Sequence, residues 1–298
     1  MNIELEDAIS VIRESYTEAS LGDFDVVGNG FGSFVLLSDD GMIFRIAKNI
    51  ETAKQYVMEC KVLPRLMKYI PLNIPNPIWY RFNATSAPYG IMAYKRLKGN
   101  PIELDKMNQS NRKSIANEVA NYINSIHQVP YEKLEVAYIP NIRNDKKTLE
   151  ALRESTFEFL KKELTVEENR KVEDWWEEIL ADDKFFQYKP SLCHGDLWYE
   201  NILVDDTYTH VIGVVDFSNM RIGDPAVDLA PQYYLGKEFY DEVLLEYTHI
   251  HKDDMWIAHR IRRHQELREI SGLQYVIKNN LFDEYKDSIA KIRERVIL

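Results

Sequence analysis

The sequence predicts an α+β fold in two lobes: a small N-terminal lobe with an antiparallel sheet and one main helix, and a larger, mostly helical C-terminal lobe. Three observations carry this prediction. Short β-rich segments dominate the first part of the chain, and helical periodicity dominates from about residue 108 onward. A hairpin-like stretch between residues 192 and 217 interrupts the helices. We expect the lobes to span residues 1–95 and 96–298.

The expected elements of the first lobe alternate between helix and strand. An amphipathic helix over residues 3–16 is followed by β-rich segments, by one long helix and by two more strands. The β-rich segments lie near 24–28, 33–38 and 42–47, the long helix covers 51–69, and the last strands cover 77–83 and 89–95. The connector at 94–99 is expected to join the lobes. Because ligand sites often lie at such junctions, we expect the active site there.

The second lobe is predicted to be built mainly from helices. They are expected at 108–128, 147–180, 232–250, 254–279 and 282–295. Between them, residues 202–204 and 211–215 are β-rich runs separated by a polar stretch, which predicts a hairpin. No internal repeat is visible.

Composition excludes several classes of protein. The net charge is −11, and residues 96–298 contain thirty-seven acidic and twenty-eight basic residues, which disfavours nucleic-acid binding and suits a cationic small molecule. The sequence contains no run of eighteen apolar residues, so we expect no membrane span. The acidic amino end lacks the form of a signal peptide. Two cysteines, Cys60 and Cys193, favour a reducing compartment. We expect a cytoplasmic enzyme, either a monomer or a weak dimer.

The most informative motif covers residues 192–201 and reads LCHGDLWYEN, with Asp216 fifteen residues after Asn201. Phosphoryl transfer needs a carboxylate for the attacking hydroxyl and Mg²⁺ for the donor phosphates. Asp196 suits the first role, while Asn201 and Asp216 offer the hard oxygen ligands that Mg²⁺ prefers. The predicted hairpin places Asn201 before one strand and Asp216 after the other, so both side chains should emerge at the same end.

The first lobe contains candidate groups for binding ATP or GTP. Lys48 ends a β-like run, where it could neutralise phosphates, and Glu59 in the next helix is expected to hold its side chain. Residues 27–35 are glycine-rich, and such a loop lets backbone N–H groups approach phosphate closely. The loop residues expected at the phosphates are Gly28, Gly30 and Ser33. Backbone groups of Ala93, Tyr94 and Arg96 are expected to meet the purine, which leaves ATP and GTP equally open.

In chain order, these motifs resemble those of the aminoglycoside phosphotransferases, which have a bilobal protein-kinase-like fold. The resemblance includes H-G-D-x4-N, residues 214–217 and the I-G-D-P-A-V-D-L run at 222–229. Residues 96–99 and 186–190 look closest to the subclass that phosphorylates the 2''-hydroxyl. The resemblance implies that Asp196 is the catalytic base, that Asn201 and Asp216 bind Mg²⁺ and that Lys48 binds phosphate. Asp224 and Asp228 are expected to shape the core.

The acceptor is less clearly indicated. Candidate substrate residues are Tyr233, Glu238, Glu266 and Glu269, because carboxylates in the helical lobe could bind the ammonium groups of an aminoglycoside. The last two stand among Arg260, Arg262, Arg263 and Arg268, which suits a polycation poorly. A macrolide, or a metabolite such as a sugar, a choline-like compound or an amino alcohol, therefore remains an alternative. A catalytically idle binding protein is disfavoured, because it would not need Lys48, Asp196, Asn201 and Asp216 together.

Overall fold

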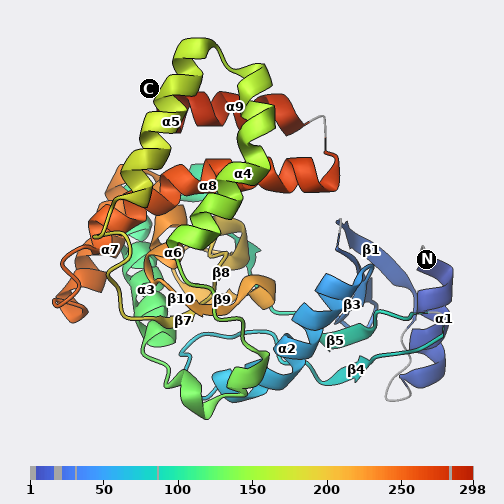
Figure 1. Cartoon of the computed structure of the whole chain (residues 1–298). Helices are drawn as coiled ribbons and strands as arrows, with labels where there is room; N and C mark the ends of the chain where they lie inside the picture. The colour runs from blue at the N-terminus through green and yellow to red at the C-terminus, as the bar shows by residue number, and fades with distance from the viewer. Residues whose placement is uncertain (1–4, 17–21, 31, 86, 282–283, 298) are drawn as a thin grey trace.

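The computed structural model describes residues 5–16, 22–30, 32–85, 87–281 and 284–297. The smaller lobe contains a five-stranded antiparallel sheet with the strand order β1-β2-β3-β5-β4 (Figure 1). Its strands are β1 (Phe24–Asn29), β2 (Ser33–Ser38), β3 (Met42–Ala47), β4 (Trp79–Arg81) and β5 (Ile91–Lys95). The expected boundary after residue 95 stays a prediction, and it coincides with the end of β5.

Two helices, α1 (Leu5–Ser15) and α2 (Ile50–Leu66), cover opposite faces of this sheet. All six residues of β3 are buried, because alternate side chains face either helix. Phe44 packs with α1, whereas Ile43 and Ala47 pack with α2. The predicted main helix is confirmed, although it ends three residues early, two residues beyond Pro64. Residues 3 and 4 of the expected first helix lie outside the described residues.

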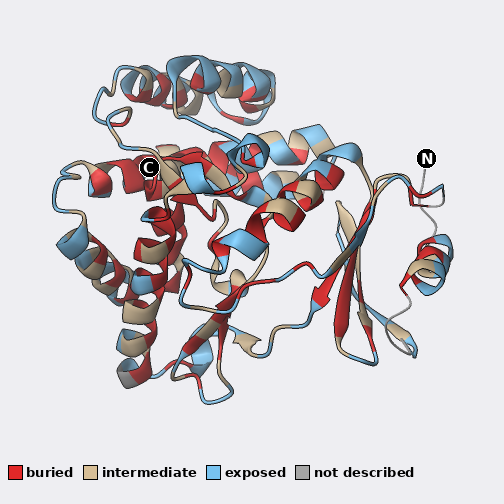
Figure 2. Cartoon of the chain, turned by 90° about the horizontal axis from the view of Figure 1, so that it is seen from below, coloured by how far each residue is buried: buried red, intermediate tan, exposed pale blue. Residues whose placement is uncertain are grey.

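The larger lobe is mostly helical, as predicted. Its helices are α3 (Gln109–His127), α4 (Lys146–Glu163), α5 (Val166–Leu180), α6 (Ala226–Leu229), α7 (Lys237–Ile250), α8 (Ile257–Asn279) and α9 (Tyr285–Ile292). Short 3₁₀ turns lie at Leu104–Lys106, Tyr131–Lys133, Val136–Tyr138, Tyr199–Asn201, Phe217–Asn219 and Ala230–Leu235, and a π-helical turn lies at Arg293–Ile297. Buried residues concentrate where these helices face one another, while the outer helix faces are exposed (Figure 2).

Three more predicted helices differ from the observed ones. The expected helix 147–180 is two helices, because Thr165 and Glu168 form a capping box that begins α5. The expected helix 232–250 begins only at Lys237, since Gly236 has a φ of 96° that a helix does not accept. The expected helix 282–295 is α9 followed by the π-helical turn, and residues 282–283 lie outside the described part of the chain.

The predicted hairpin is confirmed by the antiparallel pairing of β8 and β9. The strands of the larger lobe are β6 (Asn100–Pro101), β7 (Ser191–Cys193), β8 (Ile202–Val204), β9 (Val211–Val214) and β10 (Arg221–Gly223). β6 extends the hairpin into a three-stranded sheet, and β7 pairs with β10. The chain between α2 and β4 also reaches the hairpin, where Asn73 hydrogen-bonds the backbone of Ile212 and Val214.

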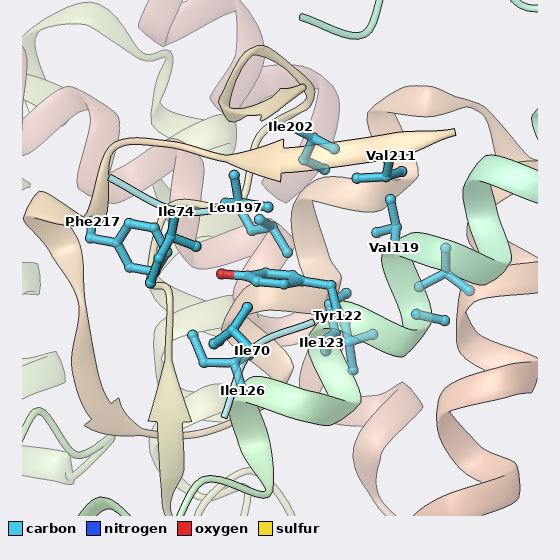
Figure 3. Close-up of a cluster of buried hydrophobic side chains, with 14 of the residues drawn as sticks. Ile70, Ile74, Val119, Tyr122, Ile123, Ile126, Leu197, Ile202, Val211 and Phe217 are labelled. Carbon is cyan, nitrogen blue, oxygen red and sulfur yellow. The ribbon is translucent and has the colours of Figure 1, made fainter. Parts of the chain in front are cut away.

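The largest core lies beneath this hairpin and joins the two lobes. Side chains of α3, of the hairpin and of the segment after α2 meet around Tyr122 (Figure 3). A second core joins α4, α5, α8 and α9, with Trp176 fully buried at its centre. The hairpin therefore has a rigid support below it and a separate helical layer beside it. No helix among the described residues is long and apolar enough to cross a membrane.

Candidate active site

The loop after β7 is held from below by the carboxylate of Asp228. Asp228 lies in α6, is fully buried, and accepts hydrogen bonds from the backbone N–H groups of His194 (2.8 Å) and Gly195 (2.7 Å). It also bonds His127 at 3.1 Å. Gly195 has a φ of 84°, and a Cβ there would lie 2.1 Å from the carbonyl oxygen of Asn219. Only glycine fits this position, which explains H-G-D physically.

Asp196 follows in this loop and is partly buried. Its carboxylate is approached by the Asn219 side-chain amide at 3.5 Å, and its carbonyl accepts a bond of 2.9 Å from the Asn201 side chain. Burial raises the pKa of the Asp196 carboxyl, and the nearby positive charges of His194 and Arg268 oppose that rise. A carboxylate with a raised pKa is a better proton acceptor. This environment therefore suits the expected role of Asp196.

Asn201 and Asp216 lie at the same end of the hairpin, as expected. Val215 N–H donates to the Asn201 carbonyl at 2.9 Å, which ties the two positions together. The Asn201 side-chain nitrogen binds Asp196, so its oxygen has no hydrogen-bond partner among the described residues. Burial would raise the pKa of Asp216, but Arg45 and hydrogen bonds from Ser218 lower it below the usual value. The two residues thus present hard oxygen atoms at one end of the hairpin, an amide oxygen from Asn201 and a charged carboxylate from Asp216.

The expected pair of Lys48 and Glu59 was wrong. Glu59 is fully buried and accepts two bonds from Arg45, at 3.0 and 3.1 Å, while Arg45 also approaches Asp216 at 3.4 Å. Lys48 instead donates to Asn29 (2.5 Å) and to the Gly30 carbonyl (2.7 Å). The reason is strand alternation, which places Arg45 on the face of β3 towards α2 and Lys48 beyond the strand.

Sequence reasoning missed Arg45, although a signal was available. In the apolar run 42–47, Arg45 has the same parity as Ile43 and Ala47, both of which face α2. A single charge on that face of a strand needs a buried partner, and α2 offers Glu59. Burial alone would lower the pKa of Arg45, but Glu59, with smaller contributions from Tyr56, Tyr94 and Asp216, holds it well above its usual value.

The glycine-rich segment forms the turn between β1 and β2, as expected for a phosphate loop. Gly28 lies at a register shift of the two strands, and Ser33 begins β2. No atom lies within 4 Å of a Cβ placed on Gly30, so that residue has open space beside it. Residue 31 lies outside the described residues. The arrangement leaves Gly28, Gly30 and Ser33 available as phosphate contacts.

The backbone groups expected at the purine are partly engaged by the sheet. Ala93 and Tyr94 are buried in β5, and the Ala93 carbonyl accepts the N–H of Ile78 at 2.9 Å. The Arg96 N–H donates to the Gly41 carbonyl at 2.9 Å. Because a carbonyl can accept a second bond, Ala93 stays a candidate. The N–H of Arg96 is already used in this bond, so only its carbonyl stays a candidate.

A cavity of about 1070 Å³ lies between the catalytic loop and helices α4, α8 and α9. Asp196 is in its wall, together with Trp198 from the same loop and with Arg268 and Glu269 from α8. Glu269 is 9% exposed and accepts a bond of 2.9 Å from the hydroxyl of Tyr234. This is the space in which an acceptor molecule can reach Asp196.

Of the four candidate substrate residues, only Glu269 lines this cavity. Tyr233 packs against Tyr240 outside it, and its neighbour Tyr234 takes the wall position. Glu238 is exposed and faces Arg112, at 3.8 Å. Glu266 bonds Trp175 at 2.9 Å on the side of α5. The cavity combines several elements, so spacing within one helix could not identify its lining.

Comparisons with known proteins agree with this geometry. The model of the family described as "Phosphotransferase enzyme family" matches residues 26–261. No curated protein matches the chain. Among solved structures, the GDP and kanamycin complex of APH(2'')-IIia superposes with a TM-score of 0.86 at 19% identity, covering 98% of each chain.

Two further solved structures have the same architecture. The gentamicin–APH(2'')-IIa complex gives a TM-score of 0.77 at 18% identity, covering 98% of this chain and 96% of that one. A macrolide 2'-phosphotransferase type I gives 0.72 at 20% identity, covering 98% of each. At these identities the likeness establishes the fold, and the expected bilobal protein-kinase-like architecture is confirmed.

Proposed function

Since this chain belongs to the phosphotransferase enzyme family, we propose that it transfers the γ-phosphate of ATP or GTP to a hydroxyl group of an aminoglycoside antibiotic, most closely in the manner of the 2''-O-phosphotransferases. Membership makes the chain a nucleoside-triphosphate-dependent O-phosphotransferase for small molecules. The aminoglycoside, its hydroxyl and the identity of the donor are the proposal. The buried free thiols Cys60 and Cys193 fit the cytoplasmic location that we also propose.

One observation carries the proposal: Asp196 belongs both to the rigid catalytic loop and to the wall of a large cavity. A volume of about 1070 Å³ accommodates a molecule of several rings. An acceptor bound there meets the carboxylate that receives the proton of its hydroxyl. A smaller space would have favoured a simple metabolite instead.

The charges of the cavity wall support a cationic acceptor. Among the described residues, Glu200, Glu269 and Glu284 line the cavity and have no ion-pair partner. Such carboxylates can each bind an ammonium group. They come from the loop, from α8 and from the segment before α9. They could therefore bind separate ammonium groups of one ligand.

Most arginines of α8 do not repel such a cationic ligand, although they lie close to Glu266 and Glu269 in the sequence. Arg260 does not line the cavity, and its charge is balanced by Asp224 and Asp254. The partners of Arg263 are Glu178, Asp182 and Glu266, and Arg262 pairs with Glu266. Of the four arginines that made a polycation pocket doubtful, only Arg268 lines the cavity.

In the proposed reaction, Asp196 orients the attacking hydroxyl and accepts its proton. The oxygens of Asn201 and Asp216 fit Mg²⁺, because carboxylate and amide oxygens suit this hard cation, and the lowered pKa of Asp216 keeps its carboxylate charged. When bound, Mg²⁺ neutralises the charge of the donor phosphates. Arg45, fixed by Glu59, adds positive charge beside Asp216, and Lys48 adds it at the glycine-rich turn.

The test is nucleotide consumption by the purified protein with a panel of acceptors. ATP and GTP are each offered with kanamycin, with gentamicin and with no acceptor, and the phosphorylated product is identified by mass spectrometry. We expect stimulated consumption and a product heavier by one phosphate. No stimulation by any aminoglycoside would remove the proposed acceptor, and an inactive Asp196→Asn variant serves as the background control.

A macrolide is the second candidate acceptor. Trp198 and Tyr234 lie 4.8 Å apart, ring to ring, in the cavity wall, and Leu149, Leu152 and Leu267 add apolar surface. This surface suits a bulky, largely apolar ring. Erythromycin in the same panel separates the two candidates, since an enzyme built for aminoglycosides should leave it unmodified.

A further inference from the structure

We propose that Arg268 tunes the choice of acceptor: its guanidinium, fixed in the cavity wall beside Asp196, favours an uncharged or anionic oxygen group next to the reacting hydroxyl over an ammonium group there. This inference rests on the proposed function, because it describes the acceptor of the same site. Ammonium groups of the acceptor then belong farther along the cavity.

The position of Arg268 is fixed by an aromatic side chain of the catalytic loop. Its guanidinium carbon lies 3.6 Å from the ring centroid of Trp198. The backbone N–H of Trp198 donates to the Asp196 carbonyl at 2.9 Å, so the stacked pair is anchored to the base. Arg268, Trp198 and Asp196 all line the same cavity. An acceptor that reaches Asp196 therefore passes this cation.

Arg268 is partly buried and differs from the buried arginines among the described residues. Arg45, Arg260 and Arg263 each have at least two carboxylate partners. Among the residues that the structure describes, Arg268 has no ion pair and no hydrogen bond. Burial lowers its pKa, yet a guanidinium stays protonated in proteins. Asp196 and Glu269 favour its charge from a distance, but neither forms an ion pair with it. A partly buried cation with no carboxylate in contact is costly for folding alone, which points to a ligand.

The stacked geometry decides which ligand group fits. A guanidinium lying flat on an indole keeps the N–H groups at its edge free, and these donate to oxygen acceptors. A hydroxyl, carbonyl or carboxylate oxygen gains such a bond, whereas an ammonium group offers no acceptor and is repelled. Glu269, the next residue, turns to Tyr234 and gives ammonium groups a separate position.

The experiment compares two acceptors that differ by one charge: kanamycin, and a kanamycin derivative acetylated at the amine beside the 2''-hydroxyl. Wild-type enzyme should favour the acetylated compound in kcat/KM by about tenfold, the scale of one screened like-charge contact. Arg268→Gln should remove this preference, and Arg268→Lys, which keeps the charge, should retain most of it. Arg262→Gln is the matched control, because Arg262 lies on the same helix, is exposed and pairs with Glu266.

Calorimetric binding of both compounds to the nucleotide-bound enzyme separates the two claims. A binding preference lost in Arg268→Gln supports the selection even if no phosphate is transferred, a result that would remove only the proposed function. Transfer with the same preference in wild type and Arg268→Gln, for variants with unchanged melting temperatures, overturns the role of Arg268. A wild-type preference for unmodified kanamycin overturns it as well.

Discussion

The catalytic loop, which leads into the β8–β9 hairpin, shares Asp196 with the acceptor cavity, but the polar groups of the two regions are held in different ways. Around the hairpin, the backbone is bound by buried partners: Asp228 takes two N–H groups of the loop, and Val215 binds Asn201. In the cavity wall, Arg268 and Glu284 have no ion pair among the described residues. The first region is preorganised for chemistry, and the second leaves part of its charged groups for a ligand.

The largest expected effect falls on the residue that belongs to both regions. Asp196→Asn should lower kcat by about a hundredfold or more, because the amide cannot accept the hydroxyl proton. Nucleotide affinity should stay nearly unchanged, as measured by calorimetric titration. Asp206→Asn, an exposed turn residue of the same hairpin, is the matched control. Equal turnover in wild type and Asp196→Asn would show that another group takes the proton.

The buried support of the loop should be expensive to disturb. Asp228→Asn should lower the free energy of unfolding by about 3 kcal/mol, because it removes a fully buried charge that binds His127 and two backbone N–H groups. Urea denaturation measures the change. Asp241→Asn, which breaks an exposed pair with Lys237, should cost less than about 1 kcal/mol. Similar losses in both variants would contradict the comparison.

The Asp228 carboxylate should also make the free energy of unfolding decrease at acid pH. Burial would raise the pKa of Asp228, but His127, His194 and the Gly195 N–H lower it below the ordinary value. A lowered folded-state pKa means that the stability is complete above the unfolded value of about 3.9 and is lost as the pH falls below it. Wild type should therefore lose more stability than Asp228→Asn between about pH 4 and pH 2. Parallel curves in urea denaturation would exclude this contribution.

The sequence predicted the hairpin region better than the cavity, for a physical reason. Asp196, Asn201 and Asp216 stand within one short segment, so local spacing and strand alternation determine their arrangement. To predict the partner of Glu59, one has to know which residues of β3 face α2. Alternation along the strand places Arg45, and not Lys48, on that face. Residues of the cavity come from the catalytic loop, from other loops, from β10 and from helices α4, α6, α8 and α9. Glu266 and Glu269 face different neighbours although they are three apart.

The next prediction concerns Arg45, the residue found to pair with Glu59 in place of Lys48. Arg45→Lys should weaken nucleotide binding about tenfold. The guanidinium of Arg45 reaches Glu59 with one terminal nitrogen and Asp216 with the other, and the single ammonium nitrogen of lysine cannot do both in the same geometry. Lys48→Met should have a smaller effect, since Lys48 contacts the glycine-rich turn and no carboxylate. Calorimetric titration with Mg²⁺ and nucleotide measures both. A larger loss in Lys48→Met would restore Lys48 as the principal phosphate-binding residue.

The smallest expected effect concerns a buried hydroxyl group, that of Tyr122, in the core beneath the hairpin. The hydroxyl of Tyr122 lies in the core beneath the hairpin, and within the described residues it has no hydrogen-bond partner (Figure 3). Tyr122→Phe should therefore raise the free energy of unfolding by about 1 kcal/mol, because it removes a buried unsatisfied group. Tyr208→Phe should lower it by a similar amount, since the Tyr208 hydroxyl donates to Glu103 at 3.0 Å. Urea denaturation of both variants decides, and a loss of stability in Tyr122→Phe would mean that the hydroxyl is bonded in solution.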